Sequence, residues 1–172
     1  MLLKAAGVLL VAAGVVAAGF EEAGKRNRCA WELEQFVRLL RFSEQEITGR
    51  RMALASVFAQ AAACTDGKAC ELGQELSARL NENGCGFLSL WESLIDRLYA
   101  EYPLSQAELC AMKQAGKAFL LPQKDLIGSQ SRMDQEILWR MCGERREHLA
   151  ADCRLIRCLS VMAGLFLTVL LL

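Results

Sequence analysis

Proline and histidine are scarce in this chain of 172 residues, which contains two prolines, Pro103 and Pro122, and one histidine, His148. Because proline interrupts helices, its scarcity leaves long stretches over which a helix can continue. A single histidine excludes most nucleophilic triads, in which histidine is the general base. No segment shows the alternating pattern of a half-buried strand. These absences favour a mostly helical protein without catalytic features.

An excess of one charge is lacking as well, because twenty Lys and Arg residues balance twenty Asp and Glu residues. A nucleic-acid-binding domain would need a basic excess, so that class of function has no support. The eight cysteines form no CxxC pair and no Cys/His cluster with zinc spacing. In a reducing compartment they are expected to be small buried hydrophobic residues, whereas outside the cell their even number would permit disulfides.

Apolar residues are concentrated at the two ends of the chain. Residues 1–20 carry one charge, Lys4, and residues 158–172 carry none. Each segment is short for a membrane span of ~20 residues, but neighbouring residues can extend both. The second is apolar all round, which favours lipid over a core helix. We therefore predict an N-terminal transmembrane segment at 1–20 and a C-terminal one at 158–172. A cleaved signal segment, and hence a secreted helical protein, is the alternative.

Basic residues lie on the inner side of each apolar segment. Lys25, Arg26 and Arg28 follow the first segment, whereas Arg154 and Arg157 precede the second. The positive-inside rule then places residues 21–157 in the cytoplasm, with both termini across the membrane. The middle of the chain is therefore expected to be a cytoplasmic helical domain.

Turn and capping signals divide this middle into helices. Ser105 and Glu108 form a capping box, and Asn83-Gly84 is a typical helix end. We expect a first helix running from the apolar segment to Gly49, a last helix starting at Asp125 or Ser129 and entering the second segment, and four between them. The intermediate helices are expected at 50–64, 68–86 with its end at Asn83-Gly84, 87–102 and 105–121. The predicted fold class is all-α, a helical bundle of about six helices whose first and last helices extend into the membrane.

Apolar residues at steps of three and four predict which helix faces are buried. In the first helix the expected core stripe is Cys29, Leu33, Phe36, Leu40, Ser43 and Ile47. In the last helix the expected stripe begins with Met133, Ile137 and Met141, and it continues through Leu138, Cys142, Leu149, Cys153 and Ile156. The tryptophans fall on or beside such faces, so a core position or a partner surface is expected for each.

The one cluster with possible chemistry surrounds His148, which lies four residues from both Glu144 and Asp152 on the same helix face. A membrane-anchored metal-binding or sensor domain is therefore an alternative function. A solvated, ion-paired face is favoured, because two carboxylates and one histidine without a second cluster match known metal sites poorly. We predict no catalytic, cofactor-binding or metal-binding residue, no cofactor, and a protein that is not an enzyme.

Several short segments carry a family resemblance through their order and spacing. They are Gly19-Phe20-Glu21, Leu39 through Glu46-Ile47, Leu104-Ser105 with Glu108, Gly116, Asp125 with Gln130, and the closing MAGLFLTVLLL. Over nearly the whole chain the sequence resembles the stage III sporulation protein AB family. One departure lies near Met52, where the family prefers a proline, and it concerns the start of the second helix.

The resemblance implies a non-enzymatic, membrane-anchored subunit of the mother-cell sporulation channel, a secretion-like complex in the outer forespore membrane. The soluble part of the family is similar to the cytoplasmic domains of the inner-membrane platform proteins of type II secretion and type IV pilus machines. By that analogy the protein is an assembly platform between a cytoplasmic secretion-type ATPase and membrane channel subunits. Partner-binding residues are then expected on charged faces of the helices: Arg50, Arg51, Arg140, Arg145 and Arg146. The alternative, that these arginines only solvate the surface, explains them equally well.

Overall fold

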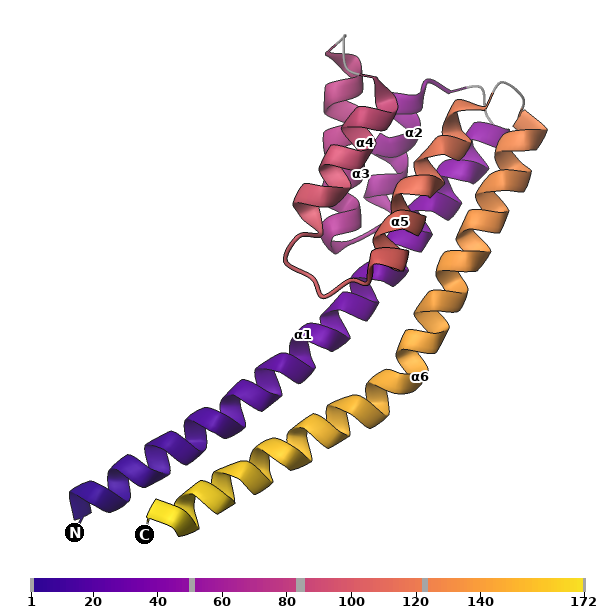
Figure 1. Cartoon of the computed structure of the whole chain (residues 1–172). Helices are drawn as coiled ribbons and strands as arrows, with labels where there is room; N and C mark the ends of the chain where they lie inside the picture. The colour runs from indigo at the N-terminus through magenta and orange to yellow at the C-terminus, as the bar shows by residue number, and fades with distance from the viewer. Residues whose placement is uncertain (1, 50–51, 83–85, 122–123, 172) are drawn as a thin grey trace. The chain divides into compact units, whose positions relative to one another are not determined.

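The computed structural model describes residues 2–49, 52–82, 86–121 and 124–171, and Figure 1 shows them as helices joined by short connections. The helices are α1 (Leu2–Gly49), α2 (Leu54–Ala63), α3 (Gly67–Asn81), α4 (Phe87–Leu98), α5 (Gln106–Ala115), the 3₁₀ helix η1 (Gly116–Leu120) and α6 (Lys124–Leu171). Over these described ranges there is no strand, which confirms the all-α helical class.

The chain divides into two compact units. Unit 1 comprises Met1–Arg28 with Glu144–Leu172, and unit 2 comprises Cys29–Gly143. The long helices α1 and α6 each contribute one part to unit 1 and another to unit 2, whereas α2 to α5 and η1 belong to unit 2 alone.

Unit 2 contains the hydrophobic core, which is centred on aromatic rings. Trp91 of α4 is fully buried and lies 5.8 Å from both Phe36 and Phe87, measured between ring centroids. The Trp91 indole N–H donates a 3.1 Å hydrogen bond to the carbonyl of Met112, so its polar atom is satisfied. A side chain at Gly116 would collide with this indole, since its Cβ would lie 2.5 Å from Cδ1. Glycine is therefore required where η1 begins.

The stripe predicted on α1 is confirmed, since Cys29, Leu33, Phe36, Leu40 and Ser43 are buried and Ile47 is half-buried. Heptad spacing predicts the buried residues correctly here, because one side of this segment packs on the core and the other faces solvent.

The predicted stripe on α6 is wrong at its start, whereas Leu138, Cys142 and Leu149 in its continuation are buried as expected. Met133 is 60% exposed and Ile137 is 47% exposed. The buried side consists of Ile127, Ser131, Asp134, Gln135, Leu138 and Cys142. Three of these residues are polar, so an apolar pattern could not reveal this side; their hydrogen bonds are described below.

Helix ends agree with the prediction at some positions and differ at others. The capping box of α5 is present, with the Ser105 hydroxyl accepting from the Glu108 N–H at 3.2 Å. Helix α2 begins at Leu54, because Ala53 has extended backbone angles. Helix α4 ends at Leu98, four residues before the predicted end, and Tyr99 becomes its buried C-cap. The predicted stop at Asn83-Gly84 lies outside the described residues.

Unit 1 is a pair of helical segments in close contact. A Cβ placed on Gly19 would lie 1.8 Å from the hydroxyl oxygen of Ser160, so only glycine allows this approach. The thiol of Cys153 donates to the carbonyl of Ala23 at 3.6 Å. Figure 1 shows the beginning of α1 and the end of α6 at the same end of this pair.

The sequence predicts transmembrane segments at 1–20 and 158–172. Among the helices of the described chain, none is long and apolar enough to cross a membrane.

Candidate partner-binding surface

Within unit 2 a buried polar contact joins α1 to α6. The Glu44 side chain is 10% exposed and accepts from Arg132 Nε at 3.1 Å. Its second oxygen accepts from Gln135 Nε2 at 2.9 Å, and that amide nitrogen also donates to the Ser131 hydroxyl at 3.0 Å. A carboxylate with both oxygens bonded tolerates burial, whereas an unpaired one does not. This contact fixes which side of α6 faces α1.

A second carboxylate on the buried side of α6 is less well satisfied. Asp134 is 7% exposed and accepts one hydrogen bond, from Gln130 Nε2 to Oδ1 at 3.2 Å. Its Oδ2 atom has no hydrogen-bond partner among the described residues. Burial raises the pKa of Asp134 above its ordinary value, and the bond from Gln130 opposes part of that rise.

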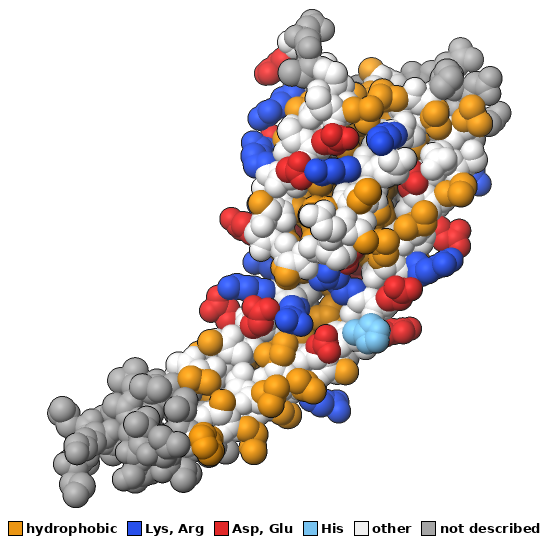
Figure 2. All heavy atoms as spheres, viewed as in Figure 1, with side chains coloured by type: hydrophobic (Ala, Val, Ile, Leu, Met, Phe, Trp, Pro, Cys, Tyr) orange, Lys and Arg blue, Asp and Glu red, His pale blue; other side chains and the backbone are white. Residues whose placement is uncertain are grey.

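The opposite side of α6 in unit 2 carries an exposed apolar stripe, which we call the α6 face and define as Leu126, Met133, Ile137 and Arg140. Steps of seven, four and three residues place these four side chains on one side of the helix. The three apolar members are 46%, 60% and 47% exposed in chain order. Figure 2 shows hydrophobic side chains among charged ones on the surface over α5 and α6.

Trp139 is 58% exposed, but it follows Ile137 by two residues and precedes Arg140 by one, so it lies on a different side of α6. Glu136 forms a 3.9 Å ion pair with Arg140 across one helical turn, and both side chains are more than 70% exposed. Methionine, aromatic residues and arginine are enriched in protein–protein interfaces, where charged residues other than arginine are depleted. The α6 face contains methionine and arginine, two of these residue types, and is therefore a candidate interface.

The structure does not bring the five predicted arginines together in one site. Arg140 belongs to unit 2 and lies on the α6 face. Arg145 and Arg146 belong to unit 1, where they are half-buried and exposed, respectively. Arg50 and Arg51 lie outside the described residues.

The alternative metal site has no structural support. Glu144, His148 and Asp152 are all exposed. No group of three or more His, Cys, Asp and Glu side chains in the described ranges is arranged to hold a metal ion. Asp152 instead lies 3.9 Å from the guanidinium of Arg26, its ion-pair partner within unit 1.

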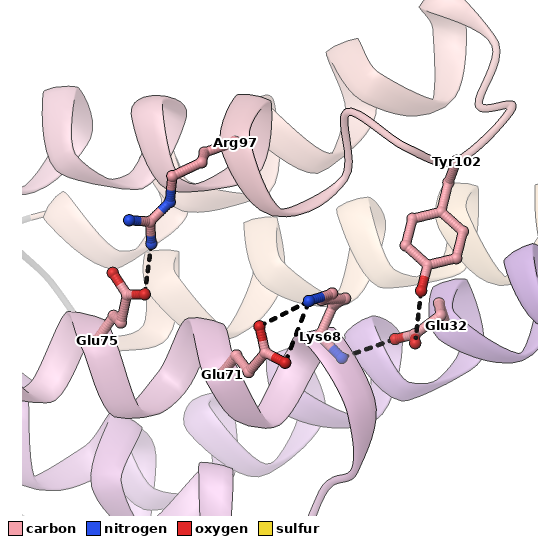
Figure 3. A network of polar contacts seen from close by, with 6 residues as sticks. All are labelled: Glu32, Lys68, Glu71, Glu75, Arg97 and Tyr102. Carbon is pink, nitrogen blue, oxygen red and sulfur yellow. Dashed lines mark hydrogen bonds and ion pairs between the residues drawn. The ribbon is translucent and has the colours of Figure 1, made fainter.

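A third buried carboxylate, that of Glu32 in α1, joins three parts of unit 2 (Figure 3). Glu32 is 1% exposed and accepts from the backbone N–H of Lys68 at 2.8 Å and from the Tyr102 hydroxyl at 3.0 Å. The N-cap residue of α3, Asp66, makes no capping bond with its own side chain. Glu32 therefore caps α3 from another helix, and the positive end of the α3 dipole favours its charge.

Burial raises the pKa of the Tyr99 hydroxyl well above its ordinary value, and the nearby Glu32 carboxylate adds to the rise. Both groups are buried, and neither lies on the surface. This polar cluster is therefore structural and is not a binding site.

Sequence reasoning named Arg140, Met133 and Ile137 but placed the two apolar residues in the core. It gave Trp139 no specific role. The sequence does contain a signal that could have separated the two sides of α6. Three polar residues recur at the same helical spacing as the buried residues Ile127 and Leu138, so all five lie on one side of the helix: Ser131, Asp134 and Gln135. Only the position of Glu44 on α1 explains why this polar side is the buried one.

A family model described as stage III sporulation protein AB matches residues 4–172, nearly the full length of the chain. Comparison with curated proteins finds no significant match. Comparison with solved structures finds none either.

Proposed function

The chain belongs to the stage III sporulation protein AB family, and from that premise we propose that it is a non-enzymatic subunit of the mother-cell sporulation channel. In this role it is an assembly platform that joins a cytoplasmic secretion-type ATPase to membrane channel subunits. Membership of the family implies a role in sporulation, and the platform role is the proposal.

The observation that carries the proposal is the α6 face. Three large apolar side chains on one side of a helix are about half exposed, with Arg140 on the same side. Full burial of such a side chain is worth about 1.5–3 kcal/mol, so a partner that covers the exposed half gains roughly half of that for each one. The polar contact at Glu44 holds α6 in this orientation, so the surface is already formed before a partner binds.

We assign the α6 face to the ATPase, because the proposed site of unit 2 is the cytoplasm, where the ATPase would be found. Arg140 would form charge-assisted contacts with carboxylates of the partner. Arg50, Arg51, Arg145 and Arg146 stay predicted contacts outside this face.

We further propose that the protein acts at the mother-cell membrane, the outer forespore membrane, with residues 21–157 on the cytoplasmic side. The distribution of Lys25, Arg26 and Arg28 supports that orientation. Exposed apolar side chains in unit 1 support attachment: Phe20, Leu155, Leu159, Val161, Met162 and Phe166. Figure 2 shows hydrophobic side chains on the described part of this unit. An isolated helix pair with so many exposed apolar side chains needs lipid or an apolar partner.

Charge insertion on the α6 face tests the platform role. We expect Met133→Glu with Ile137→Glu to weaken binding of the purified ATPase at least tenfold, about 1.4 kcal/mol, and to lower the frequency of heat-resistant spores. Gln114→Glu on the exposed side of α5 is the matched control, and circular dichroism checks that every variant is folded. ATPase binding that is equal in all three proteins would remove the α6 face from the proposed interface.

Cysteine labelling tests the location. Cys64 and Cys110 are exposed in unit 2, so a membrane-impermeant maleimide should label them in opened membranes and not in intact cells. Labelling of both thiols in intact cells would contradict the cytoplasmic placement. Alkaline extraction of the membranes then separates integral attachment from peripheral attachment.

A further inference from the structure

The part of α1 in unit 2 has a solvent-facing side that the proposed function does not use. Trp31, Arg38, Arg41 and Phe42 are exposed on it, and we call these four residues the α1 face. Steps of seven and four place Trp31, Arg38 and Phe42 on one line along the helix, with Arg41 beside them. At 1.5 Å per residue, Trp31 and Phe42 are about 16 Å apart.

Trp31 is held in place by the start of α3. A Cβ built on Gly67 would lie 2.7 Å from Cζ3 of the Trp31 ring, so the ring occupies space that only glycine leaves free. Gly67 has a φ of +62°, a backbone conformation that also favours glycine. The next residue donates its N–H to Glu32, which fixes this turn. Trp31 remains 40% exposed, and this support orients it before any partner binds.

The two arginines of the α1 face have no internal counter-charge. Neither Arg38 nor Arg41 forms an ion pair with any residue that the structure describes. Six other basic side chains of unit 2 are paired: Lys68 with Glu71, Arg79 and Arg97 with Glu75, Lys113 with Asp96, Arg132 with Glu44, and Arg140 with Glu136. Lys117 is not paired with any described residue. The α1 face therefore presents uncompensated positive charge on a surface that also carries two aromatic rings.

We propose that the α1 face binds an acidic segment of a partner protein. Its carboxylates would pair with Arg38 and Arg41, and its apolar side chains would pack against Trp31 and Phe42. Both cations are arginine, whose planar fork bonds a carboxylate through two parallel N–H groups, whereas the lysine ammonium acts as a point charge. Tryptophan and arginine are also the residue types that most often dominate binding energy at interfaces.

A partner protein explains this surface better than a lipid surface does. A helix that lies in a membrane interface needs a broad, continuous apolar side. On the α1 face the two apolar residues lie about three helical turns apart, with Arg38 and Arg41 between them. This inference does not depend on the proposed role of the α6 face, because it concerns other residues and is tested with other variants.

The test uses the full-length protein and a synthetic helical peptide of about 20 residues, with leucine at heptad core positions and glutamate on the flanks. We expect binding at low salt that weakens as salt is added, and no binding of the same peptide with lysine in place of glutamate. Arg38→Glu should lower the affinity at least tenfold, Arg38→Lys should lower it less, and Phe42→Ala should lower it as well. Lys117→Glu is the matched control, because Lys117 is exposed on η1 and the charge change is the same.

Three outcomes overturn the proposal. The first is equal affinity of the wild type and Arg38→Glu for the acidic peptide. The second is binding to phosphatidylglycerol vesicles that Arg38→Glu abolishes, without binding to the peptide, which would assign the face to lipid. The third is self-association that Arg38→Glu abolishes, again without peptide binding, which would assign it to a second copy of the chain. Variants of the α6 face should leave peptide binding unchanged. A failure of the α1-face proposal can therefore be told apart from a failure of the proposed platform role.

Discussion

The same two helices, α1 and α6, contribute to both units, yet their side chains have opposite roles in the two. In unit 2 they enclose a core that includes Phe36 and Leu138, both fully buried. In unit 1 the large apolar side chains of α6 are exposed, among them Leu159 and Met162, which are 60% and 65% exposed. Unit 2 has five further helical elements to cover an apolar side, whereas unit 1 has only the pair. Burial thus depends on how many elements share a core as well as on hydrophobicity.

Charged groups differ between the units in the same way. In unit 2 Glu32 and Glu44 are buried and receive hydrogen bonds from distant parts of the chain. In unit 1 the ion pairs Lys25–Glu21 and Arg26–Glu22 lie four residues apart on the surface. Exposed pairs of this kind contribute little to stability, whereas breaking a buried pair is strongly destabilising. The stability of the folded chain should therefore reside in unit 2.

The largest expected effect comes from the centre of that core. Trp91→Ala should lower the free energy of unfolding by about 3–5 kcal/mol, because it leaves a cavity and removes the hydrogen bond to Met112. Trp139→Ala, at an exposed position, should change it by less than about 0.5 kcal/mol. Urea unfolding followed by circular dichroism measures both variants. Similar losses at the two positions would contradict the core described for unit 2.

A smaller effect is expected at a glycine. Gly67→Ala should destabilise the protein by about 1–2 kcal/mol, because its backbone is left-handed and a Cβ would lie 2.6 Å from the Glu32 carboxylate. Gly24→Ala in unit 1 is the control, since a Cβ there meets nothing within 4 Å. The control should be neutral or slightly stabilising, because alanine favours the helix. An equal change in the free energy of unfolding for the two variants would contradict the difference in packing between Gly67 of unit 2 and Gly24 of unit 1.

The smallest expected effect depends on pH. A folded-state pKa of Asp134 above its ordinary value of 3.8 means that the native state binds the proton more tightly than the unfolded state does. The contribution of Asp134 to stability is then fully present below pH 3.8 and is lost as the pH rises through the higher folded-state pKa. Asp134→Asn should remove this loss and stabilise the protein at neutral pH by less than about 1 kcal/mol. A series of urea titrations across pH, with Glu136→Gln as an exposed control on the same helix, checks the slope.

Sequence reasoning succeeded where one local pattern decides the outcome. The stripe from Cys29 to Ser43 and the capping box at Ser105 depend on residues close together in the chain, and the structure has both. It failed for the first residues of the stripe predicted on α6. Met133 and Ile137 fit a helical stripe as well as Ile127 and Leu138 do, but only the latter two are buried. The periodicity of a helix shows that a stripe exists, but it does not show which of two stripes another helix covers.

The candidate binding surfaces were predictable to a lesser degree. Arg140 was named from its charge alone, whereas the α1 face was not found, since Trp31 and Phe42 look like core residues in sequence. Their exposure follows from the packing of the opposite side of α1, where Leu33 and Leu40 are buried. The capping of α3 by Glu32 was also beyond reach, because Glu32 and Lys68 are 36 residues apart.

The sequence by itself determined that this chain is helical, where its long helices continue, and to which family it belongs. It did so because proline, glycine, capping residues and helical spacing act over a few neighbouring positions. The tertiary structure alone decided which side of α6 is buried and which carboxylates are satisfied. The physical reason is that a polar side chain such as Gln135 can be buried only if a partner such as Glu44 lies opposite, and that partner comes from a distant part of the chain.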